Sequence, residues 1–474
     1  MIENSTQPTV AIAGGGLAGL AAACALADSG FRVTLFERRP YLGGRASSYE
    51  HPGTGEVVDN CQHVLFRLCT NLVEFYQRIG VEDKIRWFDE MIFIEPGGRT
   101  SVMRASPLPA PLHTAPSFLR FPFLLTKDKL VISRALAALA LTEQRDTGRS
   151  FLEWCRQHGQ TENAIQRFWK PILVSALSED LDLISISAAA QVVRESMKSH
   201  TARHMGVPSV PLTDLYNRAG NYIHARGGHI RYRNSLEAFS PDQSKVRIRV
   251  NDQSESEMAF DYLVLAPPFE TLGRILPQSP EAAPLRDQLS HFESSPITGI
   301  HLWFDRQITD LDHAVLLDRT IQWMFHKSRL LATRGTDARK ESGGSYVELV
   351  VSASKSLIDK SRTEIVDLAL KEVREFFPEA RAANLVKSTV IKEVHATYSP
   401  RPGIDAYRPQ QSTAWPRVFL AGDWTATGWP ATMEGAVRSG YLAAEALLRA
   451  TGITDARFLV PDLPASGFMR LFGR

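Results

Sequence analysis

Short apolar runs bounded by glycine or proline alternate along this chain with longer segments of helical periodicity. Thr9–Ala13 and Phe31–Phe36 are two such runs, and the alanine-rich segment between them, which ends at Ala27, predicts a helix. Continuous apolar strands joined by a helix are typical of a parallel sheet that is covered on both faces. The amino-terminal pattern therefore predicts a strand–helix–strand unit.

Later apolar runs predict strands at residues 227–233, 262–266, 298–304, 344–352 and 417–423. Helical periodicity predicts a helix at 362–377, a long helix that begins near Trp429 and ends near Ala446, and a mainly helical segment at about 91–205. Alternating strands and helices of this kind predict an α/β fold, with α+β character in the second half.

The turn between the first strand and its helix reads Gly-Gly-Gly-Leu-Ala-Gly and fits G-x-G-x-x-G. Gly14 permits a tight turn, Gly16 lets a pyrophosphate approach the backbone, and Gly19 lets the helix pack closely on the strand. The helix N-terminus, at Leu17 and Ala18, would offer N–H groups to the phosphates. Because strand, turn and helix are in register, a dinucleotide site is favoured over a glycine-rich turn without a ligand.

Two segments separate FAD from NAD, and the first lies just after the second strand. Glu37 ends that strand, where a carboxylate accepts hydrogen bonds from a ribose diol, and Arg38 follows it. Gly43 and Gly44 then permit close backbone approach, and Arg45 can form two parallel hydrogen bonds with phosphate. Many flavoproteins carry such a Gly-Gly-Arg across the flavin pyrophosphate.

The second segment lies near the carboxyl end. A strand ends in Gly422 and Asp423, and an aspartate in this position typically accepts a hydrogen bond from the flavin ribityl chain. The helix that follows, near Met433 and Ala436, would point its positive end at the isoalloxazine ring. The backbone near Leu236 is expected to face the adenine. These features predict non-covalent FAD, and no second G-x-G-x-x-G suggests an NADPH site.

The predicted fold is therefore α/β, with a Rossmann-like FAD-binding domain and an interleaved substrate domain made of a mixed sheet and a helical cap. The FAD domain is expected to be discontinuous, at residues 1–90, 206–275 and 391–450. The substrate domain is expected at 91–205 and 276–390, and 451–474 is expected to be a carboxyl-terminal tail.

Composition excludes several classes of protein. Lys and Arg total 54 and Asp and Glu total 52, so no global field attracts nucleic acid and we expect no such partner. The four cysteines include no C-x-x-C pair, which indicates reduced thiols in a cytoplasmic protein. The apolar stretch from Val10 to Ala27 is broken by glycines, so no transmembrane helix is expected, and we expect no metal site.

Five further segments carry a family resemblance: Asp59-Asn-Cys-Gln-His63, Phe168–Leu177, Ile186–Ala190, Gly206–Pro208 and Ala421–Gly435. They resemble the FAD-dependent desaturase and amine oxidase superfamily, of the glutathione-reductase type of FAD fold, and within it the hydroxysqualene dehydroxylases, squalene-associated desaturases of hopanoid biosynthesis. That family usually has glycine where this chain has Cys61. If the backbone there needs a positive φ, cysteine in place of glycine lowers the stability of the fold by about 1–2 kcal/mol. The favoured interpretation of Cys61 is a small buried thiol rather than a reactive one.

The resemblance implies a reaction in which hydride from reduced FAD replaces the allylic hydroxyl of hydroxysqualene and gives squalene. A general acid must then protonate the leaving hydroxyl. We expect His63 in this role, with Asp59 holding it protonated, and Glu434 as a second acid. The alternatives are that Asp59 caps a turn, that His63 is structural, and that Glu434 pairs with a helix dipole.

An isoprenoid substrate further implies an apolar pocket and access from a lipid surface. Gln62, Tyr398, Trp424 and Trp429 are the candidate pocket residues, and plain packing is the alternative for the aromatic ones. Residues 117–141 and the end of the chain, 467–474, are apolar with interspersed basic residues. They would contact the inner face of a membrane; otherwise they form a core helix and a frayed tail.

Other functions remain open on the sequence. A carotenoid-type desaturase would run the same flavin chemistry in the oxidative direction, and the electron partner is not indicated. An amine oxidase is less favoured, because no cysteine follows Cys155 to form a covalent flavin link. A lipid carrier with this fold would have lost the FAD motifs, which are intact here. A redox-neutral flavin isomerase is a further alternative.

Overall fold

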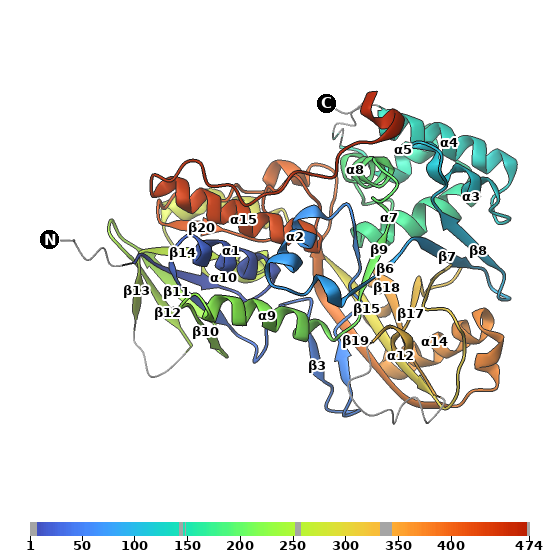
Figure 1. Cartoon of the computed structure of the whole chain (residues 1–474), viewed down its shortest axis with the longest axis horizontal. Coiled ribbons are helices and arrows are strands. Elements are labelled where there is room, and N and C mark those ends of the chain that lie inside the picture. The colour runs from blue at the N-terminus through green and yellow to red at the C-terminus, as the bar shows by residue number, and fades with distance from the viewer. Residues whose placement is uncertain (1–6, 142–145, 147, 252–256, 332–343, 472–474) are drawn as a thin grey trace.

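The computed structural model describes residues 7–141, 146, 148–251, 257–331 and 344–471. Its first lobe, at the left of Figure 1, is built on a five-stranded sheet in the order β10-β2-β1-β14-β20. The strands are His229–Tyr232, Arg32–Glu37, Thr9–Ala13, Tyr262–Leu265 and Val418–Leu420. Every neighbouring pair is parallel, so segments from both ends of the chain share one sheet.

This parallel sheet is covered on both faces. Along β1, Val10 and Ile12 join the apolar core beneath α1 (Leu17–Asp28), α9 (Leu212–His224) and α15 (Met433–Ala450). The alternate residues, Ala11 and Ala13, join a second core on the other face. The elements of that second layer are β11 (Leu236–Pro241), β12 (Val246–Val250), β13 (Met258–Phe260), α10 (Phe269–Ile275) and α11 (Ala283–Ser290). This alternation explains why the strand sequence is apolar throughout.

The second lobe is built on a seven-stranded mixed sheet in the order β19-β15-β18-β17-β16-β7-β8 (Figure 1). The strands are Leu385–Tyr398, Ser294–Phe304, Ser345–Ser352, Trp323–His326, His313–Leu316, Glu90–Ile94 and Thr100–Arg104. Helix α14 (Arg362–Phe376) packs on one face. The helices of the cap pack on the other: α3 (Ala115–Leu119), α4 (Thr126–Leu141), α5 (Phe151–Gln157), α6 (Glu162–Ala164), α7 (Lys170–Leu177) and α8 (Ile186–Met197).

Small elements connect the lobes. They are β3 (Ser48–Glu50) with β4 (Val57–Asp59), β5 (Leu65–Phe66) and β6 (Ile85–Phe88) with β9 (Met205–Pro208), α2 (Thr70–Arg78), and α12 (Lys327–Leu330). Within the described ranges, none of the helices is both long and apolar enough to cross a bilayer.

The α/β fold with interleaved lobes is confirmed, but two of the expected boundaries differ from the structure. Strand β19 runs unbroken through residue 391, so the substrate sheet extends to Tyr398. Strands β7 and β8 lie inside the segment expected to be helical, and they form one edge of that sheet. Strand β8 pairs with β7 in a local hairpin, but β7 joins the sheet through β16, more than 200 residues later, and apolar periodicity alone could not assign that partner.

Helices α1 and α15 cross at a glycine. A Cβ atom on Gly440 would overlap the carbonyl oxygen of Ala18 and lie 2.9 Å from the Cβ of Ala21. We therefore predict that Gly440→Ala lowers the free energy of unfolding by about 1–3 kcal/mol, measured by urea denaturation of the purified protein. Gly273→Ala in α10 is the matched control, since its Cβ would meet nothing within 4 Å. Equal stability of both variants would contradict this packing.

Candidate functional site

Two glycine segments meet at the carboxyl ends of the parallel strands. Gly16 and Gly43 form an isolated parallel bridge, and the Gly43 N–H donates to the Gly15 oxygen at 2.9 Å. Gly44 has a φ of 60°, and a Cβ there would lie 2.9 Å from the Gly16 Cα. Only glycine permits this approach of two backbones, so the two loops predicted to line a dinucleotide lie side by side.

The first of these loops leaves the start of α1 uncapped. Gly14 has a φ of 113°, and a Cβ on Gly19 would overlap the Gly14 carbonyl oxygen. Gly16 is the N-cap residue, and no side chain caps the N–H groups of Leu17 and Ala18. A Cβ on Gly16 would meet only the Gly44 Cα, at 3.9 Å, so the helix end faces open space. Uncapped N–H groups at a helix N-terminus fit a pyrophosphate.

Glu37 closes the glycine loop from the neighbouring strand. Its carboxylate accepts the Gly15 N–H at 2.7 Å and the Arg39 N–H at 2.8 Å, and each oxygen retains a second acceptor position for a ribose hydroxyl. Arg38, which was expected to contribute, is exposed. Arg39 instead donates to the Gly44 oxygen at 2.6 Å. No local pattern in the sequence distinguishes these adjacent arginines.

Arg45 and Asp423 join the two ends of the chain. The Arg45 guanidinium lies 2.6 Å from the Asp423 carboxylate and donates to the Ala396 oxygen at 2.7 Å. The N–H of Gly422 donates to the Ser439 hydroxyl of α15 at 2.8 Å, which fixes the strand end against that helix. The residues predicted to contact pyrophosphate and ribityl chain therefore form one polar group.

The remaining expected FAD contacts lie around the same strand ends. Leu236 begins β11. Two residues before it, the Asn234 N–H donates at 3.0 Å to the backbone oxygen of Glu37, the residue whose carboxylate is expected to bind the ribose. Met433 opens α15 and its sulfur accepts the Tyr216 hydroxyl at 3.7 Å, and Ala436 follows one turn later. Glycine loops, uncapped helix and carboxylate together fit FAD.

The loop at residues 59–63 is held by a buried lysine rather than by the expected Asp59–His63 pair. Lys327, at the start of α12, donates to the Asp59 carboxylate at 2.6 Å and to the Gln62 side-chain oxygen at 2.8 Å. Asp59 also accepts from the Ser48 hydroxyl and from the Leu212 N–H at 3.3 Å. Asp59 therefore joins the lobes through Lys327.

His63 points back at its own loop. Its Nδ1–H donates to the Cys61 oxygen at 2.8 Å, and Gln62 donates to the His63 oxygen at 3.0 Å. Burial lowers the pKa of His63, and the Arg45 and Lys327 cations lower it further. A neutral imidazole at neutral pH does not suit the general-acid role expected of it, and Gln62 is occupied in holding the loop.

Glu348 completes the buried group. It lies on β18 with no solvent exposure, and Lys327 Nζ is 3.4 Å from its carboxylate. Burial raises the pKa of Glu348 to about 8, although the Lys327 ammonium lowers that value. The cluster of Asp59, Lys327 and Glu348 thus contains one cation, one anion and a carboxyl group that stays protonated at neutral pH.

Glu434 has a structural role. Its carboxylate accepts the N–H groups of Asn71 at 3.2 Å and Leu72 at 2.7 Å, and the Asn71 side chain at 3.0 Å. These groups lie at the first turn of α2, so Glu434 caps a neighbouring helix, with Arg438 3.4 Å away. The carboxylate of the expected second acid is therefore occupied at the N-terminus of α2, and the helix-dipole alternative applies to α2 rather than to the helix that contains Glu434.

Cys61 does not strain the loop. It is absent from the described residues with positive φ, and its thiol is free and buried. Burial raises the pKa of Cys61 well above its usual value, so the thiol stays protonated. The departure from glycine at this position is tolerated because the backbone needs no left-handed conformation.

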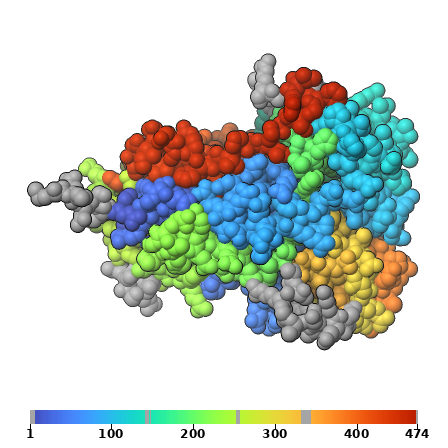
Figure 2. All heavy atoms as spheres, viewed as in Figure 1, coloured from blue at the N-terminus to red at the C-terminus, as the bar shows by residue number. Residues whose placement is uncertain are grey.

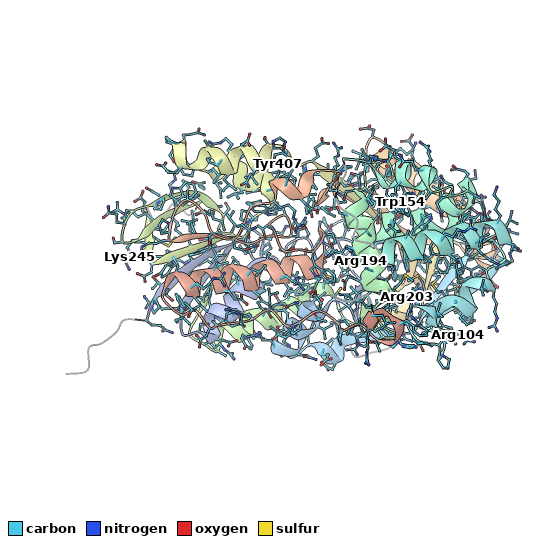
Figure 3. The ribbon with its side chains drawn as sticks, turned by 90° about the horizontal axis from the view of Figure 1, so that it is seen from above. Arg104, Trp154, Arg194, Arg203, Lys245 and Tyr407 are labelled. Atoms are coloured by element: carbon cyan, nitrogen blue, oxygen red, sulfur yellow. The ribbon has the colours of Figure 1, made fainter. Side chains whose placement is uncertain are left out.

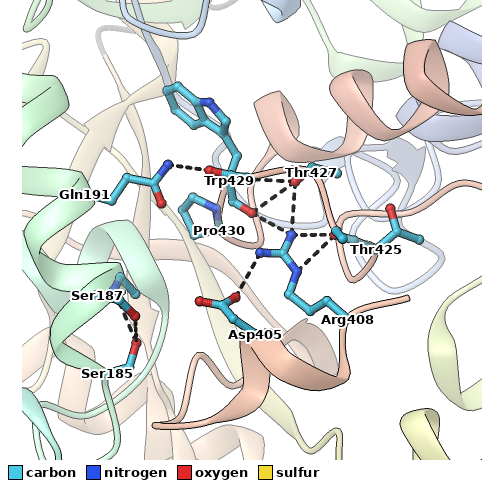
Figure 4. Close-up of polar contacts among 12 residues, drawn as sticks. Ser185, Ser187, Gln191, Asp405, Arg408, Thr425, Thr427, Trp429 and Pro430 are labelled. Atoms are coloured by element: carbon cyan, nitrogen blue, oxygen red, sulfur yellow. Dashed lines mark hydrogen bonds and ion pairs between the residues drawn. The ribbon is translucent and has the colours of Figure 1, made fainter. Parts of the chain in front are cut away.

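A cavity of about 240 Å³ lies between the start of α8 and the loop that follows Asp423. Tyr398, at the end of β19, lines it together with Gln191, Ile404, Arg408 and Pro430. Figure 4 shows Gln191 and Arg408 on opposite sides of Pro430. The cavity lies between the cap and the FAD lobe.

Arg408 holds the loop between Asp423 and α15. Its guanidinium donates to the backbone oxygens of Thr425 at 2.6 Å and Trp429 at 2.7 Å (Figure 4). It also donates to the backbone oxygen of Asp423 at 3.1 Å. Trp424 lies in the core of the FAD lobe and donates to the Pro267 oxygen at 3.1 Å. Neither tryptophan lines the described cavity, which favours packing as their role. Arg408 was missed because nothing in its local sequence marks it.

Similarity to known proteins identifies the family of this fold and site. The family model described as flavin containing amine oxidoreductase matches residues 17–448. The chain belongs to the flavin-containing amine oxidoreductase family. Its cofactor is accordingly FAD.

Relatives of this flavin-containing amine oxidoreductase include desaturases. It is 28% identical to 15-cis-phytoene desaturase of Synechococcus elongatus, over 93% of this chain and 95% of that protein. It is 27% identical to zeta-carotene desaturase of Synechocystis sp., over 93% of this chain and 97% of that protein.

Solved structures with the same fold include an oxidoreductase from Methanosarcina mazei, with a TM-score of 0.69, 17% identity and coverage of 92% of this chain and 99% of that one. Putrescine oxidase bound to putrescine also has a TM-score of 0.69, with 16% identity over 94% of this chain and 99% of that one. These likenesses show the fold.

We predict that Arg45→Met weakens FAD binding by about 10-fold or more, because a charge-assisted hydrogen bond contributes about 1.5–3 kcal/mol. The measurement is titration of apoprotein with FAD, followed by flavin fluorescence. Arg247→Met, an exposed arginine on β12, is the control and should bind FAD as the wild type does. Unchanged affinity in Arg45→Met would remove this residue from the site.

We predict that Glu348→Gln flattens the dependence of stability on pH. The folded protein keeps the Glu348 proton up to about pH 8, whereas the unfolded chain releases it near 4.5, so stability falls as pH rises between these values. Between pH 6 and pH 8 the free energy of unfolding should fall by about 1–2 kcal/mol more in the wild type than in the variant. Chemical denaturation at both pH values measures this. Glu237→Gln, an exposed control, should keep the wild-type slope.

Proposed function

We propose that this protein transfers hydride between FAD and a long, linear isoprenoid chain. The near full-length similarity to desaturases of phytoene and zeta-carotene carries this proposal, because both substrates are extended isoprenoid hydrocarbons. The cavity at Tyr398 is lined by the apolar Ile404 and Pro430 and by the polar Gln191, Asp405 and Arg408, and its volume of about 240 Å³ would take only a part of such a chain. When bound, FAD supplies the hydride acceptor or donor.

Oxidation is the leading direction. Desaturation removes a hydride and a proton from neighbouring carbons, so an external electron acceptor must then reoxidise the cofactor. The protein's part is to bind the chain, exclude water and align two carbons with the cofactor. The bonds that Arg408 makes to the 423–429 loop would keep the cavity wall and the cofactor site in fixed register.

Reductive dehydroxylation of hydroxysqualene is the second candidate. The loop at residues 59–63 and the segment at 421–435 favour it, because they resemble the hydroxysqualene dehydroxylases. This reaction consumes reduced FAD and needs a proton donor at the leaving hydroxyl. His63 is poorly suited to that role as a neutral imidazole, so the donor would be another group or a bound water.

Anaerobic single-turnover experiments test both directions with the purified FAD-loaded protein. We predict that the oxidised protein bleaches near ~450 nm, a general flavin property, when phytoene is added, and yields a polyene with a longer conjugated system. In the second arm, photoreduced protein is mixed with hydroxysqualene, and squalene is measured by gas chromatography while the flavin colour returns.

The two arms separate the alternatives. Polyene formation supports the leading direction, and squalene formation without polyene formation supports dehydroxylation. If either lipid binds but the flavin spectrum never changes and no product forms, the protein is an isoprenoid carrier and the oxidoreductase proposal is wrong.

A further inference from the structure

Three segments that are distant in sequence form one surface at the end of the cap. His200 donates its Nε2–H to the Leu108 oxygen at 2.6 Å, so the 198–204 loop is tied to the 105–114 loop. The short carboxyl-terminal helix η8 (Gly467–Leu471) joins them through the Phe468 N–H, which donates to the Ala110 oxygen at 2.8 Å. Figure 2 shows η8, in red, raised on the surface beside the cap.

This surface exposes large apolar side chains. Leu108 is 43% exposed, Leu112 48%, Phe468 49% and Leu471 77%. The hydrogen bonds above hold together the backbone segments that carry these four exposed side chains, which are called the apolar patch below. Contiguous exposed apolar side chains mark a contact with another apolar surface.

A recess at the edge of the patch contains an arginine without an acidic partner. Arg203 lines this recess with Arg104, His200 and Asp89, and Figure 3 shows both arginines beside η8. The only hydrogen bond described for the Arg203 guanidinium is to the Met103 sulfur, and no carboxylate pairs with it in the described ranges. Burial lowers the pKa of Arg203 to about 10, so it remains a cation at neutral pH.

The neighbouring groups do not supply the missing anion. Asp89 also lines the recess, yet the described structure pairs it with neither arginine. Arg104 lies 3.1 Å from Glu90 and is itself exposed. His113 is buried with neither ring nitrogen bonded, and its pKa is lowered to about 4, so it is neutral. Arg203 is partly exposed, and a guanidinium without a counter-ion at a surface attracts an external anion.

The size of the recess limits what enters. Its volume is about 20 Å³, which holds a group the size of one water molecule. One phosphate oxygen fits, while the rest of a phosphate ester would stay at the mouth, beside the exposed leucines. Arg470 on η8 is exposed beside the patch and adds a further positive charge.

We propose that this surface docks on an anionic phospholipid bilayer, with a lipid phosphate oxygen bound at Arg203 and with Leu108, Leu112, Phe468 and Leu471 inserted among the acyl chains. Helix α8 connects this surface to the cavity, since its first residues lie at the cavity and its last residue precedes the 198–204 loop. The proposal does not depend on which reaction the flavin performs.

Vesicle sedimentation of the FAD-loaded protein tests the proposal. On phosphatidylglycerol-containing vesicles, Arg203→Gln should bind about five-fold more weakly than the wild type, since one arginine near an anionic surface contributes about 1 kcal/mol. On phosphatidylcholine vesicles the two should bind equally. The affinity of a double variant, Leu112→Ser with Phe468→Ser, should be about ten-fold lower than that of the wild type on both kinds of vesicle.

Matched controls lie on the other surfaces. Arg247→Gln on β12 and Val386→Ser on β19, which is 60% exposed in the wild type, should bind vesicles as the wild type does. Flavin content and thermal unfolding confirm that each variant is folded.

Two outcomes would overturn the proposal. The first is equal binding of Arg203→Gln and wild type to anionic vesicles. The second is that inorganic phosphate raises the unfolding temperature of the wild type but not that of Arg203→Gln, and that neither protein sediments with vesicles. That result would assign the recess to a free anion.

Discussion

The close approach of two backbones, at Gly16 and at Gly43–Gly44, is the constraint on which the rest of this structure depends. A side chain at Gly44 would meet the Gly16 Cα at 2.9 Å, so the second loop could not lie against the first. With the loops together, the N-terminus of α1, the Glu37 carboxylate and Arg45 face the same space. The carboxyl-terminal strand then brings Asp423 within 2.6 Å of Arg45, and the site is complete.

The contact between the two lobes depends on buried charged side chains rather than on close packing of two backbones. Lys327 and Glu348 come from the substrate lobe, whereas Asp59 belongs to a hairpin of the FAD lobe. Breaking one buried partner leaves an uncompensated charge, so such a cluster strongly disfavours separation of the lobes. Holding the 59–63 loop by Lys327 therefore fixes the edge of the substrate space relative to the FAD site, without any contact to substrate.

Local sequence predicted the nucleotide half well, because its chemistry is contiguous. Strand β1 has the expected bounds, and α1 differs by about one residue. The errors concern long-range partners. Asp59 was expected to pair with His63, but it accepts from Lys327, 268 residues later, and the sequence contains no signal that links these two residues. Glu434 likewise caps a helix 362 residues earlier, which local dipole reasoning assigned to its own helix.

The substrate remained harder to predict than the cofactor for a physical reason. A dinucleotide requires glycines, a helix end and a carboxylate at defined positions, whereas an isoprenoid chain requires only apolar volume, which many sequences provide. Tyr398 lines the cavity together with Ile404 and Pro430. The sequence around Ile404 and Pro430 does not distinguish them from residues that only pack in the core. The polar groups that distinguish oxidation from dehydroxylation are few, and the two most conspicuous, His63 and Glu434, are used to hold the fold. The direction of the reaction therefore depends on the electron partner and on a proton path that the apolar pattern does not encode.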